Sequence, residues 1–135
     1  MKEPIWVFKQ AILHLHGVSL ARFGGASGMR DEGLFDGALA RPLNLFHYGG
    51  ENDLAAFAAA YAFGIAKDHP FIDGNKRTAF LACGVFLDIN GSPLAAMPDD
   101  AISAMLALAA GTIGEAHFAA WIRANHPEVP NPDFR

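Results

Sequence analysis

Two charge-free stretches flank one strongly polar loop in this chain. Residues 54–66 and 78–87 contain no Asp, Glu, Lys or Arg. A helix that is apolar on every side belongs in the core of its domain, so the segment joining two such helices must emerge from the interior at one place. That segment carries a base, a carboxylate, a glycine, an amide and two cations: His69, Asp73, Gly74, Asn75, Lys76 and Arg77.

Composition narrows the class of protein. A length of 135 residues, with 52% hydrophobic and 18% charged residues, suits one domain with a substantial core and excludes a disordered chain. Abundant Ala and few β-branched residues favour helix. A formal net charge of −4 argues against direct nucleic-acid binding. The lone Cys83 permits neither an internal disulfide nor a cysteine-based zinc site, and we expect it in the core.

The spacing of apolar residues and helix stop signals predicts an all-α, single-domain bundle over residues 1–126, followed by a loose tail at 127–135. About six helices are expected, at 5–23, 32–41, 54–67, 75–89, 99–110 and 115–125. Pro42 is expected to end the second helix, and Asn52 or Asp53 to cap the third. The polar loop then lies at the N-terminus of a central buried helix.

Helical spacing also predicts which side chains face inward. They are Phe8, Ala11, Ile12, Leu15 and Val18 in the first helix, Leu34, Phe35, Ala38 and Leu39 in the second, Ile102, Met105, Leu106 and Ala109 in the fifth, and Phe118 and Ile122 in the last. Two loops keep two interpretations each. Residues 24–28 are a plain loop or a phosphate cradle, and residues 43–51 are an exposed irregular loop or a flap over a neighbouring site.

No membrane segment or signal peptide is evident. The longest uncharged run among the predicted helices has thirteen residues, against about 20 needed to span a bilayer. We therefore expect a soluble, cytoplasmic protein with no membrane contact.

The polar loop has the parts of a phosphate site. Gly74 allows a tight turn, and the backbone N–H groups of Gly74, Asn75 and Lys76 fall where a helix begins and its dipole is positive. Such a helix start binds anions. Lys76 and Arg77 add two positive charges, so the loop suits a polyphosphate better than a single carboxylate.

Asp73 and His69 supply the remaining chemistry. Asp73 is a candidate ligand for the Mg²⁺ of a nucleotide, or alternatively a helix cap or ion-pair partner. His69 precedes Pro70, which should end the third helix and push His69 towards an extended conformation. It is a candidate general base for an attacking hydroxyl, or a structural histidine. Phosphoryl and nucleotidyl transfer depend mainly on positioning and charge neutralisation, which these groups provide. Phe71 is expected to anchor the loop in the core.

The run from His69 through Phe71, Asp73, Gly74, Asn75, Lys76 and Arg77 to Thr78-Ala79 resembles the signature of the Fic/Doc superfamily in its Doc branch. Gly24-Gly25 with Gly28-Met29-Arg30-Asp31, and Leu87 with Asn90-Gly91, extend the similarity over roughly residues 12–125. The resemblance implies a compact helical bundle. It implies His69 as general base, Asp73 as metal-linked carboxylate, and Gly74, Asn75, Lys76 and Arg77 as phosphate binders.

One departure separates this chain from the AMP-transferring Fic enzymes. Their motif has a second glycine where Lys76 stands, and a further Arg where Phe80 stands. The Doc branch shares the lysine. The resemblance therefore implies transfer of the terminal phosphate of ATP, with Mg²⁺, to a Ser or Thr hydroxyl of elongation factor Tu, which blocks translation. It also implies a small antitoxin whose disordered C-terminal segment folds onto the toxin.

Two alternatives remain open at this point. The chain is a Fic-type AMP transferase, or it is an inactive protein that keeps the fold and only binds a partner. The protein substrate, the antitoxin and the oligomeric state do not follow from the sequence.

Overall fold

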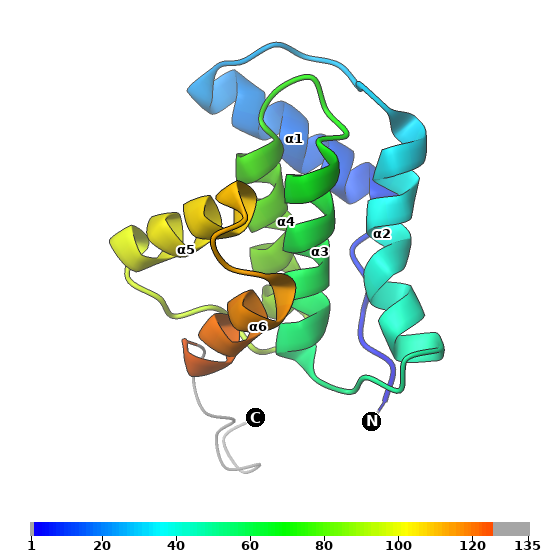
Figure 1. Ribbon diagram of the computed structural model, residues 1–135. Helices are drawn as coiled ribbons and strands as arrows, with labels where there is room; N and C mark the ends of the chain where they lie inside the picture. Colours follow the sequence, from blue (N-terminus) through cyan, green and yellow to red (C-terminus); the bar gives the residue numbers. More distant parts are fainter. Residues whose placement is uncertain (1, 126–135) are drawn as a thin grey trace.

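A computed structural model describes residues 2–125 and places six α-helices among them, with no β-sheet in that range. They are α1 (Lys9–Phe23), α2 (Glu32–His47), α3 (Leu54–Asp68), α4 (Asn75–Ile89), α5 (Pro98–Ala110) and α6 (Glu115–Ala124). The antiparallel pair α3 and α4 stands at the centre. α2 and α6 pack against α3, α1 packs against α4, and α5 contacts both central helices (Figure 1). The predicted all-α bundle is confirmed.

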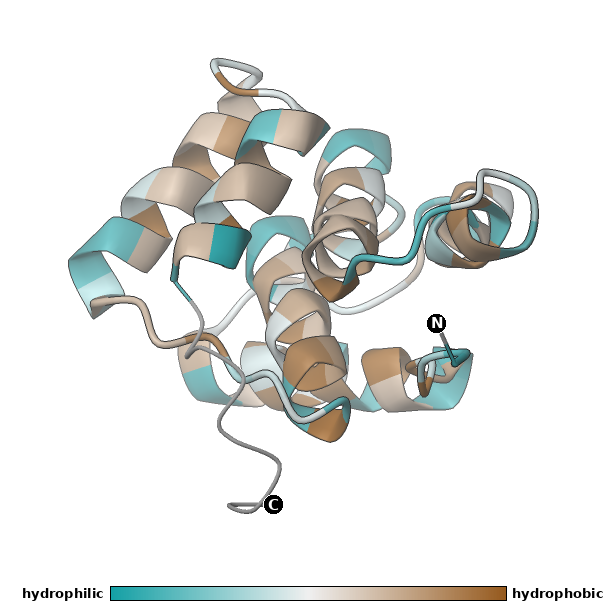
Figure 2. Cartoon of the chain, turned by 90° about the horizontal axis from the view of Figure 1, so that it is seen from below, coloured by the Kyte–Doolittle hydropathy of each residue, from teal (hydrophilic) through white to brown (hydrophobic). Residues whose placement is uncertain are grey.

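α3 is the most buried helix, as the charge-free stretch at residues 54–66 predicts. Phe57, Tyr61 and Ile65 have no solvent exposure. Asp53 caps the helix through a hydrogen bond from the Ala55 N–H at 3.1 Å, so the second of the two predicted caps is the one used. Hydrophilic segments gather at helix ends and loops (Figure 2). Within residues 2–125, no helix combines the length and the hydropathy that a membrane span requires.

The predicted start of the first helix is wrong, because residues 5–8 are extended and α1 begins at Lys9. Distant side chains hold this segment. Asn90 bonds both the N–H and the C=O of Ile5, at 2.8 Å each, and the phenolic oxygen of Tyr61 accepts from the Val7 N–H at 3.0 Å. These bonds satisfy backbone groups that a helix would otherwise satisfy, so the helical spacing that runs back to residue 5 is overridden.

The predicted inward face of α1 is also wrong in part. Ile12 is fully buried, but Phe8 and Val18 are 73% and 49% exposed. The helix instead buries Ile12 together with two polar residues, His16 and Ser19. The polar loop described below explains that choice, because both side chains bond to it.

α2 continues through Pro42 to His47, which corrects the predicted end at residue 41 and the predicted irregular loop over residues 43–47. A proline inside a helix costs about 3 kcal/mol. Here Pro42 is itself buried, and Leu45 and Phe46 on the following turn pack against the core, so burial offsets that cost. Residues 48–53 then turn into α3 at the end of that helix opposite the polar loop (Figure 1), so they are not a flap over it.

The bounds of the last two helices agree with prediction to within one residue. The buried face of α5, however, differs from the predicted one. It buries Ala101, Met105 and Leu108, whereas Ile102 and Leu106 are 58% and 51% exposed. In α6 the predicted Phe118 and Ile122 are buried. The predicted tail at 127–135 lies outside the described residues.

Candidate functional site

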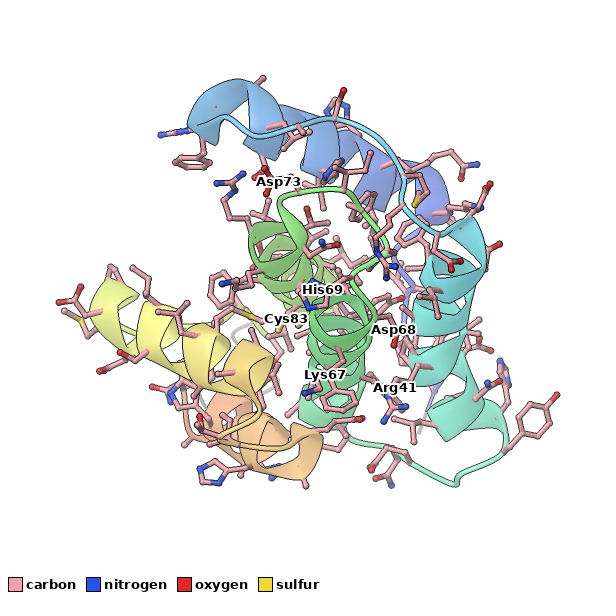
Figure 3. All side chains as sticks on the ribbon, turned by 45° about the horizontal axis from the view of Figure 1, so that its top comes forward. Arg41, Lys67, Asp68, His69, Asp73 and Cys83 are labelled. Carbon is pink, nitrogen blue, oxygen red and sulfur yellow. The ribbon has the colours of Figure 1, made fainter. Side chains whose placement is uncertain are left out.

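The motif loop, residues 69–74, joins the C-terminus of α3 to the N-terminus of α4 (Figure 3). Gly74 is the N-cap residue of α4 with φ 78°, a left-handed conformation that a glycine adopts without strain. All six predicted site residues therefore lie in this loop or in the first turn of α4, as the sequence pattern predicts.

His69 ends α3, as expected, but its backbone is left-handed rather than extended, with φ 49° and ψ 55°. Its N–H still donates to the Ile65 carbonyl at 3.2 Å. The residue is exposed. A general base must reach the hydroxyl from which it takes a proton. An exposed histidine just after a helix end is accessible to such a hydroxyl.

The carboxylate of Asp73 joins two segments. One oxygen accepts from the Gly74 N–H at 2.8 Å and the other from the Ala26 N–H at 3.2 Å. These two bonds, followed by the charges of Arg77 and His16, hold the pKa of Asp73 below its usual value of 3.8. The Asp73 carboxylate is thus ionised, and its two hydrogen bonds fix its orientation. Within residues 2–125 no group of three or more His, Cys, Asp or Glu is arranged to hold a metal, so any metal here would draw most of its ligands from a bound molecule and water.

Asn75 clamps the loop from inside. Its side-chain oxygen accepts from the Phe71 N–H and its amide nitrogen donates to the Phe71 carbonyl, both at 2.9 Å. Phe71 is 1% exposed, which confirms the predicted core anchor. Its ring stacks on His16 with centroids 3.8 Å apart and an interplanar angle of 11°. His16 also places Nε2 2.8 Å from the Asp73 carbonyl oxygen, which can only accept, so Nε2 carries the proton.

The first turn of α4 keeps an anion site open. The N–H groups of Asn75, Lys76 and Arg77 have no intrahelical acceptor, because the first helical bond runs from Thr78 to the Gly74 carbonyl. Lys76 is exposed, and its ammonium has no ion-pair or hydrogen-bond partner in the described part of the chain.

Arg77, in contrast, is tied to α1. Its Nε donates to Ser19 Oγ at 3.0 Å, its Nη2 donates to the Gly24 carbonyl at 2.7 Å, and its guanidinium lies over the Phe23 ring at 5.5 Å. Because these contacts use two of its donors, Lys76 is the freer cation of the pair.

The glycine-bearing loop 24–28 packs against the motif loop instead of lying free. Gly25 has φ 126°, and a Cβ there would fall 2.9 Å from the Asp73 carboxylate. A Cβ on Gly28 would fall 2.9 Å from Ile72. Next to it, the Ile72 N–H donates to the Gly28 carbonyl at 3.0 Å, and Met29 forms an isolated antiparallel bridge with Phe71. These glycines serve close approach of two backbones.

An apolar groove borders the site. It has a volume of about 400 Å³ and lies between α1, α4 and α5. Phe23, Phe80, Ile102 and Leu106 line it, and Lys76 and Arg77 stand at its edge. The groove accounts for the exposed side of α5, since Ile102 and Leu106 face this space and not the core.

Three residues that hold the motif loop were not predicted as site residues: His16, Ser19 and Arg30. His16 and Ser19 share a face with Ile12 at spacings of four and seven residues, which is a helical signal. Polar residues on a buried helix face indicate hydrogen bonds to other groups within the fold. Arg30 gives no such periodic signal, because it acts from a loop.

Comparison with known proteins tests the family resemblance that the motif indicates. A sequence profile described as the Fic/DOC family matches residues 6–87, more than half of the chain. The chain is 45% identical over 75 residues to "Toxin Doc" of Mycolicibacterium smegmatis, covering 55% of this chain and 58% of that protein. It is 34% identical over 82 residues to "Protein kinase doc" of Escherichia phage P1, covering 61% of this chain and 65% of that protein.

The chain thus spans less than two thirds of the length of each of these relatives. The family match over residues 6–87 contains the whole motif loop together with α1 and residues 24–31, which hold it. The chain belongs to the Fic/Doc family.

Proposed function

We propose that this chain is the toxin of a toxin–antitoxin pair and transfers the γ-phosphate of ATP to a Ser or Thr hydroxyl of a protein. The acceptor we expect is elongation factor Tu, and the consequence is a block of translation. The start of α4 carries the proposal. Its first turn offers three N–H groups and a Lys76 ammonium that have no partner among residues 2–125, and these lie next to an ionised Asp73 and an exposed His69.

Phosphate binding falls to the first turn of α4. The N–H groups of Asn75, Lys76 and Arg77 point where a phosphate can accept from them, at the positive end of the helix dipole. The Lys76 ammonium would neutralise a terminal phosphate. The Asp73 carboxylate fits Mg²⁺ that also binds phosphate oxygens, because it is an ionised hard ligand with no neighbouring acid to complete a protein-only site. When bound, Mg²⁺ neutralises charge on the phosphates.

His69 supplies the base. Its ring would accept the proton of the acceptor hydroxyl as that oxygen forms a bond to the γ-phosphorus and the bond from the γ-phosphorus to the bridging oxygen breaks, so that ADP leaves. The exposed position of His69 suits a protein substrate, since a large acceptor must approach from solvent.

Lys76 favours terminal transfer over AMP transfer. A lysine side chain at the helix start occupies space that an AMP-transferring Fic enzyme leaves open, and Phe80 lies in the apolar groove where such an enzyme has a second arginine. The similarity to a protein named as a kinase supports the same choice.

Labelled ATP tests the proposal. The purified chain is incubated with elongation factor Tu and ATP labelled at either the γ- or the α-phosphate, with His69→Ala as the inactive control. We expect label from the γ-position alone, and none with the variant. Label from the α-position alone would establish AMP transfer in its place, and label from neither would favour a protein that only binds.

The antitoxin segment is assigned to the apolar groove. A disordered segment that folds on binding needs an apolar surface to offset its ordering, and this groove runs up to Lys76 and Arg77. An occupant there would therefore sit beside the phosphate site. Leu106→Asp places a charge in the lining of the groove at a half-exposed position. In co-expression with an antitoxin that neutralises the wild type, we expect this variant to stay toxic, and equal neutralisation of both would refute the assignment.

A further inference from the structure

Arg30 reaches from the segment between α1 and α2 to the end of α3. Its Nε donates to the His69 carbonyl and its Nη2 to the Asp68 carbonyl, each at 2.6 Å. The backbone N–H groups of Arg30 and Asp31 both donate to the Pro70 carbonyl, at 2.7 and 3.0 Å. One short segment therefore holds three successive carbonyls around His69.

The residue between these carbonyls has an unfavourable backbone. His69 is the one residue other than glycine with positive φ among residues 2–125. A side chain with a Cβ disfavours the left-handed region, and a residue followed by proline normally adopts an extended conformation. Such a conformation persists only where the surroundings impose it. Rotation of His69 towards the extended region would turn its carbonyl away from the Arg30 guanidinium.

We propose that Arg30 is a positioning residue for His69. Its guanidinium grips the carbonyls of Asp68 and His69 and keeps the histidine left-handed, and that backbone sets the direction of the imidazole ring. Arg30 itself touches no reacting group. The catalytic consequence rests on the proposed function, whereas the conformational part stands on the contacts alone.

The geometry requires an arginine more than it requires a charge. Two adjacent carbonyl acceptors need two donors held in a fixed fork, which the planar guanidinium supplies and a lysine ammonium does not. Any cation at the C-terminus of α3 gains from the helix dipole, so Arg30→Lys separates charge from geometry. We expect Arg30→Lys to behave much more like Arg30→Ala than like wild type.

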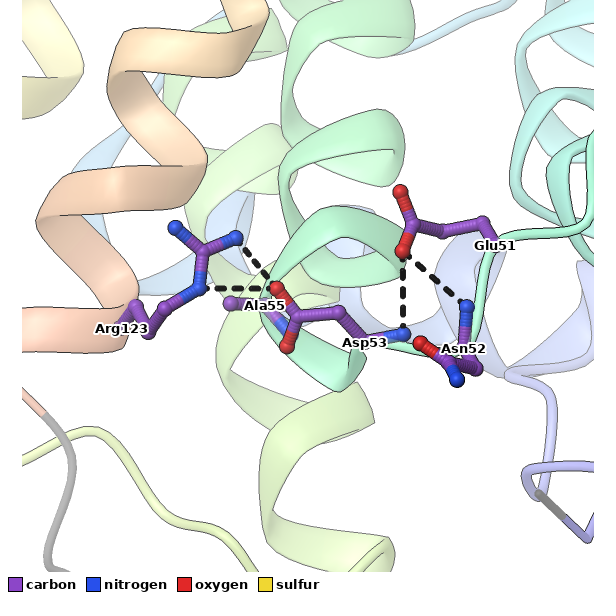
Figure 4. A network of polar contacts seen from close by, with 5 residues as sticks. All are labelled: Glu51, Asn52, Asp53, Ala55 and Arg123. Atoms are coloured by element: carbon purple, nitrogen blue, oxygen red, sulfur yellow. Dashed lines mark hydrogen bonds and ion pairs between the residues drawn. The ribbon is translucent and has the colours of Figure 1, made fainter.

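A matched control exists at the other end of the same helix. Arg123 is exposed, and its guanidinium pairs with Asp53 at the N-terminus of α3 (Figure 4), with Nε 2.9 Å from the carboxylate. Arg123→Ala removes the same charge and an exposed contact without touching the motif loop. Arg30 is exposed too, so neither variant opens a cavity in the core.

Steady-state phosphoryl transfer to elongation factor Tu is measured for wild type, Arg30→Ala, Arg30→Lys and Arg123→Ala. Arg30→Ala should lower kcat about tenfold, which corresponds to about 1.4 kcal/mol in the barrier, with KM for ATP changed less than about twofold. KM should hold because the proposed phosphate contacts lie in the first turn of α4. Added guanidinium ion should restore part of the Arg30→Ala rate. Arg123→Ala should match wild type.

A second readout needs no activity. A left-handed residue gives a strong NOE between its own amide and Hα protons, and we expect this NOE for His69 in wild type and Arg123→Ala and its loss in Arg30→Ala. If wild type transfers no phosphate, the proposed function fails and this NOE alone decides the inference. An Arg30→Ala protein that keeps the His69 NOE, or one in which active wild type and variant share the same kcat, would overturn it.

Discussion

Replacement of Asn75 by alanine tests whether its side chain holds the motif loop in place or serves only to bind phosphate. The Asn75 side chain makes two hydrogen bonds of 2.9 Å to the backbone of Phe71, and both residues are buried, with 8% and 1% exposure. The Phe71 N–H and carbonyl face Asn75, while the bonds that bridge to the 28–31 segment use the neighbouring residues Pro70 and Ile72. Asn75→Ala therefore leaves two buried backbone groups without their partners.

The expected cost follows from those two groups. A buried donor or acceptor left unsatisfied costs about 1–3 kcal/mol. Water can reach a loop more easily than a core, so we take the lower half of that range for each group and expect a loss of about 2–4 kcal/mol in the free energy of unfolding. A domain of this size has about 5–15 kcal/mol of stability, so the variant should still fold. With a urea m-value of roughly 1–3 kcal/mol/M, the unfolding midpoint should fall by at least about 0.7 M.

Urea unfolding followed by circular dichroism measures this loss. Asn44→Ala is the matched control, because Asn44 is exposed on α2 and its side chain makes no hydrogen bond within the described chain. That variant should stay within about 0.5 kcal/mol of wild type. Asn75→Asp sharpens the test, because it is nearly isosteric but faces the Phe71 carbonyl with an acceptor instead of a donor. We expect it to be at least as unstable as Asn75→Ala at neutral pH.

An unfolding midpoint of Asn75→Ala equal to wild type would refute the clamp. If the Asn75 side chain served only as a phosphate ligand, the opposite result would be expected. Its loss would weaken ATP binding and leave the stability of the free protein unchanged. The two roles are thus separated by measuring stability without nucleotide.

Three further outcomes follow from single features of the site. Lys76→Ala should lower phosphoryl transfer by about 100-fold, because a terminal phosphate charge is left unneutralised, and wild-type turnover would refute its phosphate role. Gly25→Ala should lower the unfolding midpoint, because its Cβ meets Asp73 at 2.9 Å and φ is 126°, whereas Gly17→Ala, with nothing within 4 Å, should raise stability by about 0.5–1 kcal/mol. Burial raises the pKa of Tyr61 from 10.0 to about 12, so its share of stability is complete below pH 10 and is lost as pH rises through 12. Urea midpoints from pH 8 to 11 should therefore fall less steeply in Tyr61→Phe.

The central helices and the position of the motif loop between them were predictable because their signals are local. The charge-free stretches predict two buried helices, and the Gly74-Asn75 junction predicts where the second begins. The errors arise where distant residues decide. Tyr61 and Asn90 hold residues 5–8 extended from 54 and 85 positions away, and no local pattern reports such bonds.

The predictions of which helix faces are buried failed for a different physical reason. Hydrophobic spacing finds an apolar stripe but does not say whether the core or a groove receives it. In α5, Met105 is buried at the boundary of the core and the groove, while Ile102 and Leu106 are exposed along the groove, although all three fit one helical stripe. The predicted helix end at Pro42 was wrong because Pro42 lies on the buried face of α2, and burial of that face offsets the usual helix-breaking cost.

The motif loop is only half of the site, and the other half comes from the first 31 residues. His16 and the Ala26 N–H hold Asp73, Ser19 holds Arg77, and Arg30 holds the carbonyl of His69. These contacts fix the position of the loop backbone, of the Asp73 carboxylate and of the Arg77 guanidinium. Among the described residues, the His69 ring, the Lys76 ammonium and the N–H groups of the first α4 turn keep no hydrogen-bond or ion-pair partner. If the proposed function holds, substitution of His16, Ser19 or Arg30 should therefore alter catalysis through the position of these groups, without removing any group proposed to bind the nucleotide.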